Sequence, residues 1–91
     1  VNIFPSQVDD LLKDIEGAYS EFQIMIDHIN GKDIITVFVE AIEGANKYEL
    51  ENELQVAFKN KIGLTPLVKP VEIGDLPRSE KKSTRVFDNR Y

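Results

Sequence analysis

The sequence predicts an α+β domain, a two-layer sandwich in which two helices cover one face of a small, mostly antiparallel sheet. Three observations lead to this fold class. Two stretches have the apolar spacing of helices, two alternating stretches flank an Asn-Gly pair, and a further extended stretch follows the second helix. The expected order is βαββαβ with a basic C-terminal tail. At 91 residues we expect one domain, residues 1–91, with a folded body over 1–76 and a loop and tail over 77–91.

The first helix is expected over residues 7–16, after a short extended stretch at residues 1–4 that Pro5 ends. Ser6 is a residue type favoured at the helix N-cap. Apolar residues then recur at the helical spacing i, i+3, i+4 and i+7, namely Val8, Leu11, Leu12 and Ile15. Gly17 is expected to stop the helix.

The strongest local pattern is a β-hairpin around Asn30-Gly31. This dipeptide favours a type I′ turn, because both central residues of that turn need a positive φ. A two-residue turn pairs Phe22 with Val39, Ile24 with Val37 and Ile26 with Ile35. One face of the hairpin is then continuous core, and a four-residue loop would keep the same face. The other face, which includes Thr36 and Glu40, is mostly polar and is expected to be solvated or covered by another segment.

A second helix is expected after Asn46, an N-cap residue with Glu49 three positions later. Its buried stripe is predicted to consist of Leu50, Leu54, Ala57 and Phe58, and Gly63 ends it. Residues 65–73 are then extended, with Leu67, Val71 and Ile73 in one phase of the alternation. Pro66 and Pro70 each remove a backbone donor, so this strand is expected at an edge of the sheet.

Composition excludes several classes of function. The chain has no cysteine, which excludes disulfides, thiolate metal sites and cysteine nucleophiles. Its formal net charge of −5 argues against a nucleic-acid binder, and no apolar run approaches the length of a membrane span. His28 has no second histidine, so a structural or solvated role is expected and no metal site is predicted. The chain begins at Val1 and not at a methionine, so we expect it to be a piece of a longer protein. Because no signal sequence is visible and no disulfide can form, we expect a cytoplasmic location.

Charge is distributed unevenly along the chain. Residues 1–58 hold 12 acidic and 3 basic side chains, whereas residues 59–91 hold 4 acidic and 8 basic ones. The asymmetry suggests that the C-terminal part contacts something anionic. On charge alone, a solvated terminus is the simpler interpretation. The sequence contains no P-loop, glycine-rich phosphate cradle or nucleophile elbow, so it has no self-contained active site.

Two stretches, one at each end of the chain, carry a resemblance to a known family. Residues 2–8 read Asn-Ile-Phe-Pro-Ser-Gln-Val, and residues 76–90 read Leu-Pro-Arg-Ser-Glu-Lys-Lys-Ser-Thr-Arg-Val-Phe-Asp-Asn-Arg. The first resembles the opening of the C-terminal domain of phenylacetate-CoA ligases, in the adenylate-forming acyl-CoA synthetase superfamily. The second is similar to the closing pattern of that domain, Leu-Pro-Arg-Ser-Glu-Gly-Lys-x-x-Arg-Val-x-Asp-x-Arg. The intervening elements fit in order and length, so the resemblance covers essentially the whole chain.

The resemblance implies the C-terminal domain of an ATP-dependent aryl-acid CoA ligase of phenylacetate catabolism, inactive alone. In such ligases an N-terminal adenylation domain of the same chain binds ATP, its Mg²⁺ and the aryl acid. The carboxylate attacks the α-phosphate and releases pyrophosphate, and the small domain supplies a lysine to this step. The small domain then rotates and presents another face for thioester formation with coenzyme A. ATP and coenzyme A are thus expected as substrates of the full enzyme, with no cofactor bound by this chain alone.

Carried over residue by residue, the resemblance makes Lys82 the catalytic lysine. It makes Arg78, Ser79, Lys81 and Arg85 the expected substrate- or nucleotide-binding residues. The chain departs from the family at Lys81, which stands where the family has glycine. Because a lysine reaches positive φ less easily than glycine, the loop geometry is expected to differ, and a competition between Lys81 and Lys82 for the role stays open.

Two other classes of function fit a small α+β domain. One is a stand-alone regulatory domain that binds a small molecule. The other is a protein-interaction module that uses its edge strand. An adenylation domain upstream in the same reading frame would favour the ligase over both.

Overall fold

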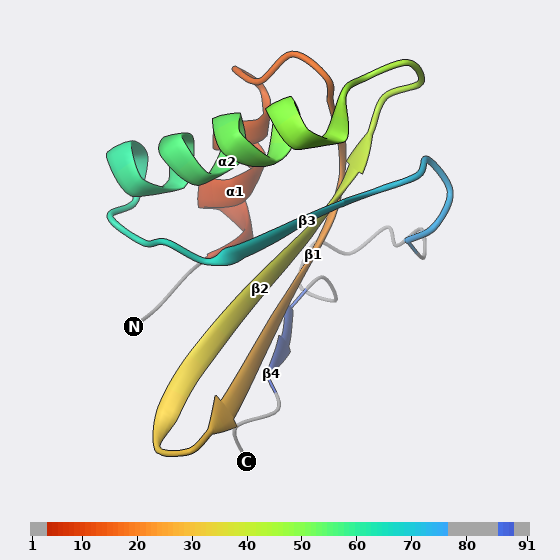
Figure 1. Ribbon diagram of the computed structural model, residues 1–91. Helices are drawn as coiled ribbons and strands as arrows, with labels where there is room; N and C mark the ends of the chain where they lie inside the picture. The colour runs from red at the N-terminus through yellow and green to blue at the C-terminus, as the bar shows by residue number, and fades with distance from the viewer. Residues whose placement is uncertain (1–3, 77–85, 89–91) are drawn as a thin grey trace.

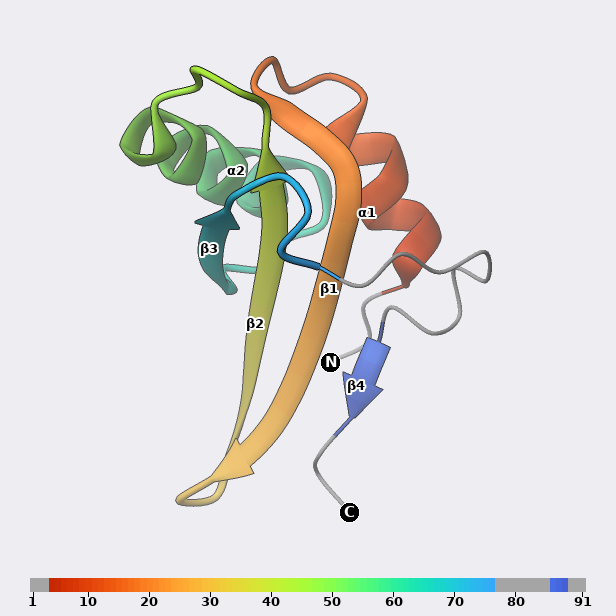
Figure 2. The ribbon, with the colours of Figure 1, turned by 90° about the vertical axis from the view of Figure 1, so that its right-hand side faces the viewer.

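The computed structural model describes residues 4–76 and 86–88 (Figure 1). The elements are α1 (Pro5–Leu12), β1 (Ala18–Ile29), β2 (Lys32–Ala41), α2 (Lys47–Lys61), β3 (Leu67–Val71) and β4 (Val86–Asp88). The strands form one sheet in the order β3-β2-β1-β4. Both helices lie on the same side of this sheet (Figure 2), which confirms the predicted two-layer α+β sandwich. Of the expected first strand, residues 1–3 lie outside the described residues, and Phe4 is extended.

The hairpin of β1 and β2 has the predicted register. Phe22 pairs with Val39, Ile24 with Val37 and Ile26 with Ile35, all in antiparallel orientation. At the turn, φ is 53° at Asn30 and 79° at Gly31. Both central residues thus have the positive φ that a type I′ turn requires, which is why asparagine and glycine occupy these positions.

The two outer strands pair parallel to the hairpin strands. β3 runs parallel to β2, because α2 returns the chain to the end of the sheet where β2 began. β4 runs parallel to β1 and lies within the part of the sequence expected to be loop and tail. The local sign of this strand in the sequence is the apolar pair Val86-Phe87. Because its partner strand lies more than fifty residues away in the sequence, local patterns do not predict the pairing.

β3 is an edge strand as predicted, but its inward-facing residue differs from the expected alternation. Val68 is only 2% exposed, whereas Leu67 is 53% exposed. The parallel register places Val68 beside Val37, so Val68 enters the core and Leu67 points to the opposite face. The proline spacing predicted the edge position correctly, because Pro70 needs no ladder partner for its nitrogen.

Helix α1 starts earlier and ends earlier than the sequence predicts. Its N-cap is Phe4, whose backbone N–H donates to the Gln7 Oε1 atom at 3.1 Å, and Ser6 lies inside the helix. Pro5 fits the first turn because that position needs no intrahelical N–H bond. After Leu12 the chain tightens, and Ile15 N–H donates to the Leu12 carbonyl at 3.2 Å.

The second helix matches its predicted N-cap. The Asn46 side chain accepts hydrogen bonds from the backbone N–H groups of Tyr48 and Glu49, at 2.9 and 3.2 Å. The core between helices and sheet consists of Val8, Leu11, Leu12, Phe22, Ile24, Ile26, Val37, Val39, Ala41, Leu50, Leu54, Phe58 and Val68. Ala57, expected in the buried stripe, is only half-buried. No helix among the described residues is long and apolar enough to cross a membrane.

Candidate functional site

All five site residues predicted from the sequence lie outside the described residues. They are Arg78, Ser79, Lys81, Lys82 and Arg85, within the segment 77–85. The structure describes the residues on either side of this segment, Leu76 and Val86. The described part of the candidate site therefore consists of Leu76, Val86 and the strands that they contact.

A short turn leads the chain from β3 onto the open face of the sheet, the face away from the helices (Figure 2). The turn is closed by two hydrogen bonds of 3.1 Å. The backbone N–H of Glu72 donates to the Asp75 side chain, and the backbone N–H of Asp75 donates to the Glu72 carbonyl. Gly74 provides the positive φ, at 94°. The Glu72 carboxylate also pairs with Lys47 at the start of α2, so the turn is tied to the helix layer.

Leu76 is the first boundary of the segment. Its side chain is 8% exposed, and its backbone N–H donates to the Oε2 atom of Glu40 at 3.1 Å. Glu40 lies near the end of β2 and is completely buried. Because Glu40 and Val39 are neighbours in a strand, their side chains point to opposite faces, and Glu40 points to the open face. Leu76, the described residue that precedes segment 77–85, is therefore held over β2.

Val86 is the second boundary. Its backbone pairs with Ile24 of β1, and Phe87 pairs with Met25. Val86 packs against the core, while Phe87 is 43% exposed. Val86 is thus held beside β1, so the described residues on either side of segment 77–85 lie on two neighbouring strands of one sheet.

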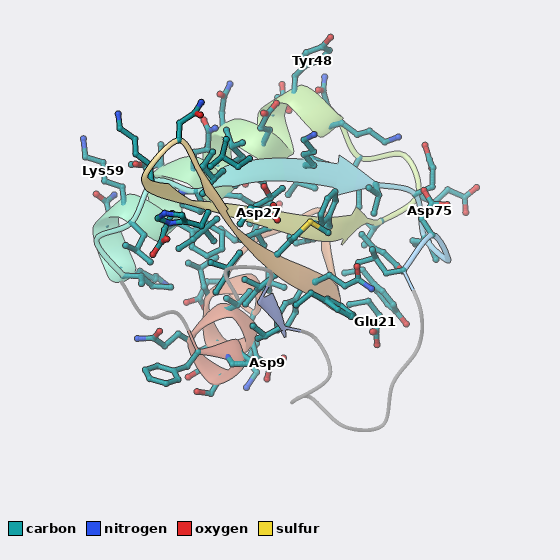
Figure 3. The ribbon with its side chains drawn as sticks, turned by 90° about the horizontal axis from the view of Figure 1, so that it is seen from below. Asp9, Glu21, Asp27, Tyr48, Lys59 and Asp75 are labelled. Atoms are coloured by element: carbon teal, nitrogen blue, oxygen red, sulfur yellow. The ribbon has the colours of Figure 1, made fainter. Side chains whose placement is uncertain are left out.

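The open face carries more apolar side chains than Met25 and Phe38, the two that the sequence alternation places there, because Leu67 and Phe87 join it. A row of neighbouring residues crosses all four strands in register, formed by Leu67, Thr36, Met25 and Phe87. Thr36 is buried, Met25 is half-buried, and the two outer residues of the row are exposed. Figure 3, which looks along the molecule from below, shows Asp75 where the chain leaves β3 and Asp27 on β1.

A hollow on the surface lies elsewhere, between the turn after α1, the start of β1, the loop from β2 to α2, and α2 itself. It measures about 590 Å³, and its lining includes Glu16, Glu43, Glu49 and Glu53. Four carboxylates make a poor environment for phosphate groups, because like charges repel. Glu49 and Glu53 are exposed to solvent, and Glu51 is half-buried.

His28 has a structural contact at the end of the hairpin. Its Nδ1 atom lies 2.8 Å from the Asp33 carboxylate, and the two residues are paired across β1 and β2. Among residues 4–76 and 86–88, no three side chains of the metal-binding types are grouped to hold an ion. The contact between His28 and Asp33 joins the two strands beside the turn.

One ion pair connects the turn after α1 to the last turn of α2. The Lys61 ammonium donates to Asp14 Oδ2 at 2.5 Å. This hydrogen bond, together with the positive charge of Lys61, lowers the pKa of Asp14 below its ordinary value of 3.8. Both side chains are largely exposed, so the pair belongs to the surface of the helix layer and not to the open face.

Glu40 is the site residue that sequence reasoning missed. It was counted among the polar residues of a solvated or covered face. Its position in the sequence indicates burial, because Glu40 directly follows Val37, Phe38 and Val39 and precedes Ala41. A carboxylate inside an apolar run is rarely buried without a hydrogen-bond partner, so such a residue indicates a specific contact.

Comparison with known proteins identifies the family. Residues 1–90 match the sequence profile of the AMP-binding enzyme C-terminal domain. The chain is also 32% identical, over 96 aligned residues, to a phenylacetate-coenzyme A ligase of Escherichia coli (strain K12). The chain therefore belongs to the AMP-binding enzyme C-terminal domain family, and the resemblance found in the sequence is confirmed. The alignment covers 99% of this chain but only 22% of the length of that relative.

Solved structures agree with this assignment. A domain of phenylacetate-coenzyme A ligase from Bacteroides vulgatus ATCC 8482 matches with a TM-score of 0.84 at 32% identity, covering 100% of this chain and 88% of that one. A 2-hydroxyisobutyryl-CoA ligase in the postadenylation state, in complex with 2-HIB-AMP, matches with a TM-score of 0.78 at 28% identity. That match covers 97% of this chain and 20% of the ligase.

Proposed function

We propose that this chain is the C-terminal domain of an ATP-dependent CoA ligase of the phenylacetate type, and that Lys82 serves its adenylation step. The partner is an N-terminal adenylation domain of the same protein. Two findings support this: the family assignment, and the small share of the Escherichia coli ligase that the chain spans. The stand-alone binding and interaction roles are not favoured by these findings. The cytoplasmic location stays a prediction.

The observation that carries the proposal is the way segment 77–85 is bounded. Leu76 is held over β2 by a buried hydrogen bond, and Val86 is held beside β1 by strand pairing. Between them the sequence has four basic residues and one acidic residue, whereas residues 1–58 carry a net charge of −9. The residues that flank the most cationic part of the chain thus have fixed positions on the sheet, which supports a role for that segment in approaching an anion.

The chemistry of adenylation explains the need for such a segment. The carboxylate of the acid and the α-phosphate of ATP are both anions, and negative charge moves onto the departing pyrophosphate. A positioned cation favours this transition state, and one such donor typically contributes about 3–4 kcal/mol. The ammonium of Lys82 is a compact point charge suited to that task. ATP, its Mg²⁺ and the aryl acid would bind on the adenylation domain, and coenzyme A would enter for the thioester step after the small domain has turned.

The proposal is tested in the full-length ligase by measuring the two half-reactions separately. Lys82→Ala should lower ATP–pyrophosphate exchange with phenylacetate by about 10²–10³-fold, because it removes one transition-state donor. Thioester formation from supplied phenylacetyl-adenylate should fall by much less, since that step uses another orientation of the domain. Lys81→Ala removes the neighbouring lysine and tests the assignment, and it should lower exchange far less than Lys82→Ala does.

Three results would contradict the proposal or correct it. Equal small effects of both substitutions would mean that the two lysines are only solvated. A larger loss for Lys81→Ala would move the catalytic role by one residue. Robust ATP–pyrophosphate exchange by the purified 91-residue chain alone would show that the site is not divided between two domains.

A further inference from the structure

Glu40 is a buried carboxylate to which the adenylation chemistry assigns no role. Its side chain is 0% exposed, the lowest value for any charged residue that the structure describes. Taking a carboxylate out of water is unfavourable unless hydrogen bonds replace its hydration. A domain of this size has little stability to spare, so a carboxylate at this position calls for an explanation beyond packing.

The contact made by Glu40 lies directly before the segment that carries Lys82. Oε2 of Glu40 accepts the backbone N–H of Leu76 at 3.1 Å, across 36 positions of sequence. Residue 77 starts the segment, and Lys82 follows Leu76 by six residues. Glu40 itself is held by strand pairing on β2, where its partner on β3 is Val71. The carboxylate thus connects the rigid centre of the sheet to the backbone that leads to the lysine.

We infer that Glu40 is a positioning residue for the proposed catalytic lysine, acting through its hydrogen bond to Leu76. This inference rests on the proposed function. A charged acceptor forms a hydrogen bond roughly twice as strong as a neutral one, and burial keeps water from competing for the Leu76 N–H. Precise placement matters because a displacement of about 1 Å at a reacting centre can lower a rate by about 10²-fold.

The test measures both half-reactions in full-length ligase variants, with thermal unfolding to follow the fold. Glu40→Met keeps the volume and removes the acceptor, and it should lower ATP–pyrophosphate exchange by about 10²-fold. Glu40→Gln keeps an acceptor oxygen without the charge, and its loss should be about tenfold. Thioester formation from supplied phenylacetyl-adenylate should change by less than about threefold in both. Thr36→Val alters the other buried polar residue of the same face and should leave both rates unchanged.

A double-mutant cycle separates positioning from general stability. In a Lys82→Ala background, Glu40→Gln should have no further effect on exchange, because the lysine that it positions is gone. A residue that only supports the fold would lower exchange in both backgrounds and would lower both half-reactions together. This cycle also decides the matter if Glu40→Met does not fold.

The outcomes distinguish this inference from the proposed function. If Lys82→Ala lowers exchange while Glu40→Gln and a folded Glu40→Met leave it unchanged, the positioning role of Glu40 is overturned and the proposed function stands. If Lys82→Ala itself has no effect, the proposed function fails, and the role of Glu40 fails with it.

Discussion

The two faces of the sheet are stabilised by different kinds of contact. On the face beneath the helices, Phe22, Ile24 and Val39 are almost completely buried against apolar side chains of α1 and α2. On the open face, the chain from Glu72 to Leu76 crosses without regular secondary structure, and a buried carboxylate accepts one of its backbone N–H groups. Phe87 on that same face stays 43% exposed.

The two kinds of contact serve different purposes: apolar burial stabilises the fold, whereas the hydrogen bond to Glu40 fixes the position of the Leu76 backbone. Apolar burial is non-directional, so the helix face contributes most of the folding free energy but tolerates some exchange between apolar residues. A hydrogen bond to a buried carboxylate is directional and depends on one donor and one acceptor. We therefore expect substitutions on the helix face to act mainly on the free energy of unfolding. Substitutions at Glu40 on the open face should act mainly on the proposed adenylation step.

The largest expected effect comes from a pair of neighbouring residues that face opposite ways. Ile24→Asp places a carboxylate in the core against Val37, which should cost several kcal/mol and unfold a domain of ordinary stability, about 5–15 kcal/mol. Met25→Asp places the same charge on the half-buried open face and should cost much less. Thermal unfolding followed by circular dichroism measures both. Equal losses would mean that the two faces of the sheet contribute alike to the free energy of unfolding.

A smaller effect is expected from two phenylalanines, one for each face. Phe58 on α2 is fully buried, so Phe58→Ala should lower the free energy of unfolding by about 3–5 kcal/mol. Phe87 on β4 is partly exposed, and Phe87→Ala should cost about 1 kcal/mol or less. Urea unfolding of the 91-residue chain measures both values. A loss at Phe87 as large as that at Phe58 would place the open face within the main core.

The smallest effect concerns the surface of the helix layer. The Asp14 pKa is lowered in the folded state by the hydrogen bond and the charge of Lys61. Because the unfolded chain binds that proton more readily, the contact stabilises the fold above the ordinary pKa of 3.8 and loses this contribution as pH falls through the folded value. Lys61→Gln should raise the Asp14 pKa toward 3.8, as measured by NMR titration of its carboxyl group.

Lys59→Gln is the control for this measurement, since it removes a lysine from the same last turn of α2 and leaves the pair with Lys61 in place. A matching rise in the Asp14 pKa in that variant would show that general charge, not the direct contact, is responsible. High salt should reduce the lowering of the Asp14 pKa by Lys61, because both side chains are exposed and salt screens their charges.

The elements predicted correctly are those whose signals are local. Asn30 and Gly31 lie next to each other and set the hairpin turn, and the alternation on both sides then sets the register. Asn46 lies only two and three positions before Tyr48 and Glu49, whose backbone N–H groups it caps. The errors arose where a local signal was weak. The end of α1 was placed at residue 16 from apolar spacing alone, yet Ile15 reaches the core from a tightened turn after Leu12.

The candidate site was predicted from a resemblance and not from local physics. Lys82 and the four accompanying residues match a family pattern, and their roles stay predictions because they lie outside the described residues. The division of the chain into a body over 1–76 and a loop and tail over 77–91 also stays a proposal. Glu40 could not be assigned from the sequence, because its contact with Leu76 joins positions 36 residues apart.

The sequence by itself determined the two helices, the hairpin and its register, and the edge position of β3. Each of these follows from residues within a few positions of one another, where backbone preferences and periodicity act directly. Only the tertiary structure decided that Val68 faces the core, that β4 joins β1, and that Glu40 holds Leu76. These contacts join distant parts of the chain, and their free energy appears only when the sheet has assembled and excludes water from both partners.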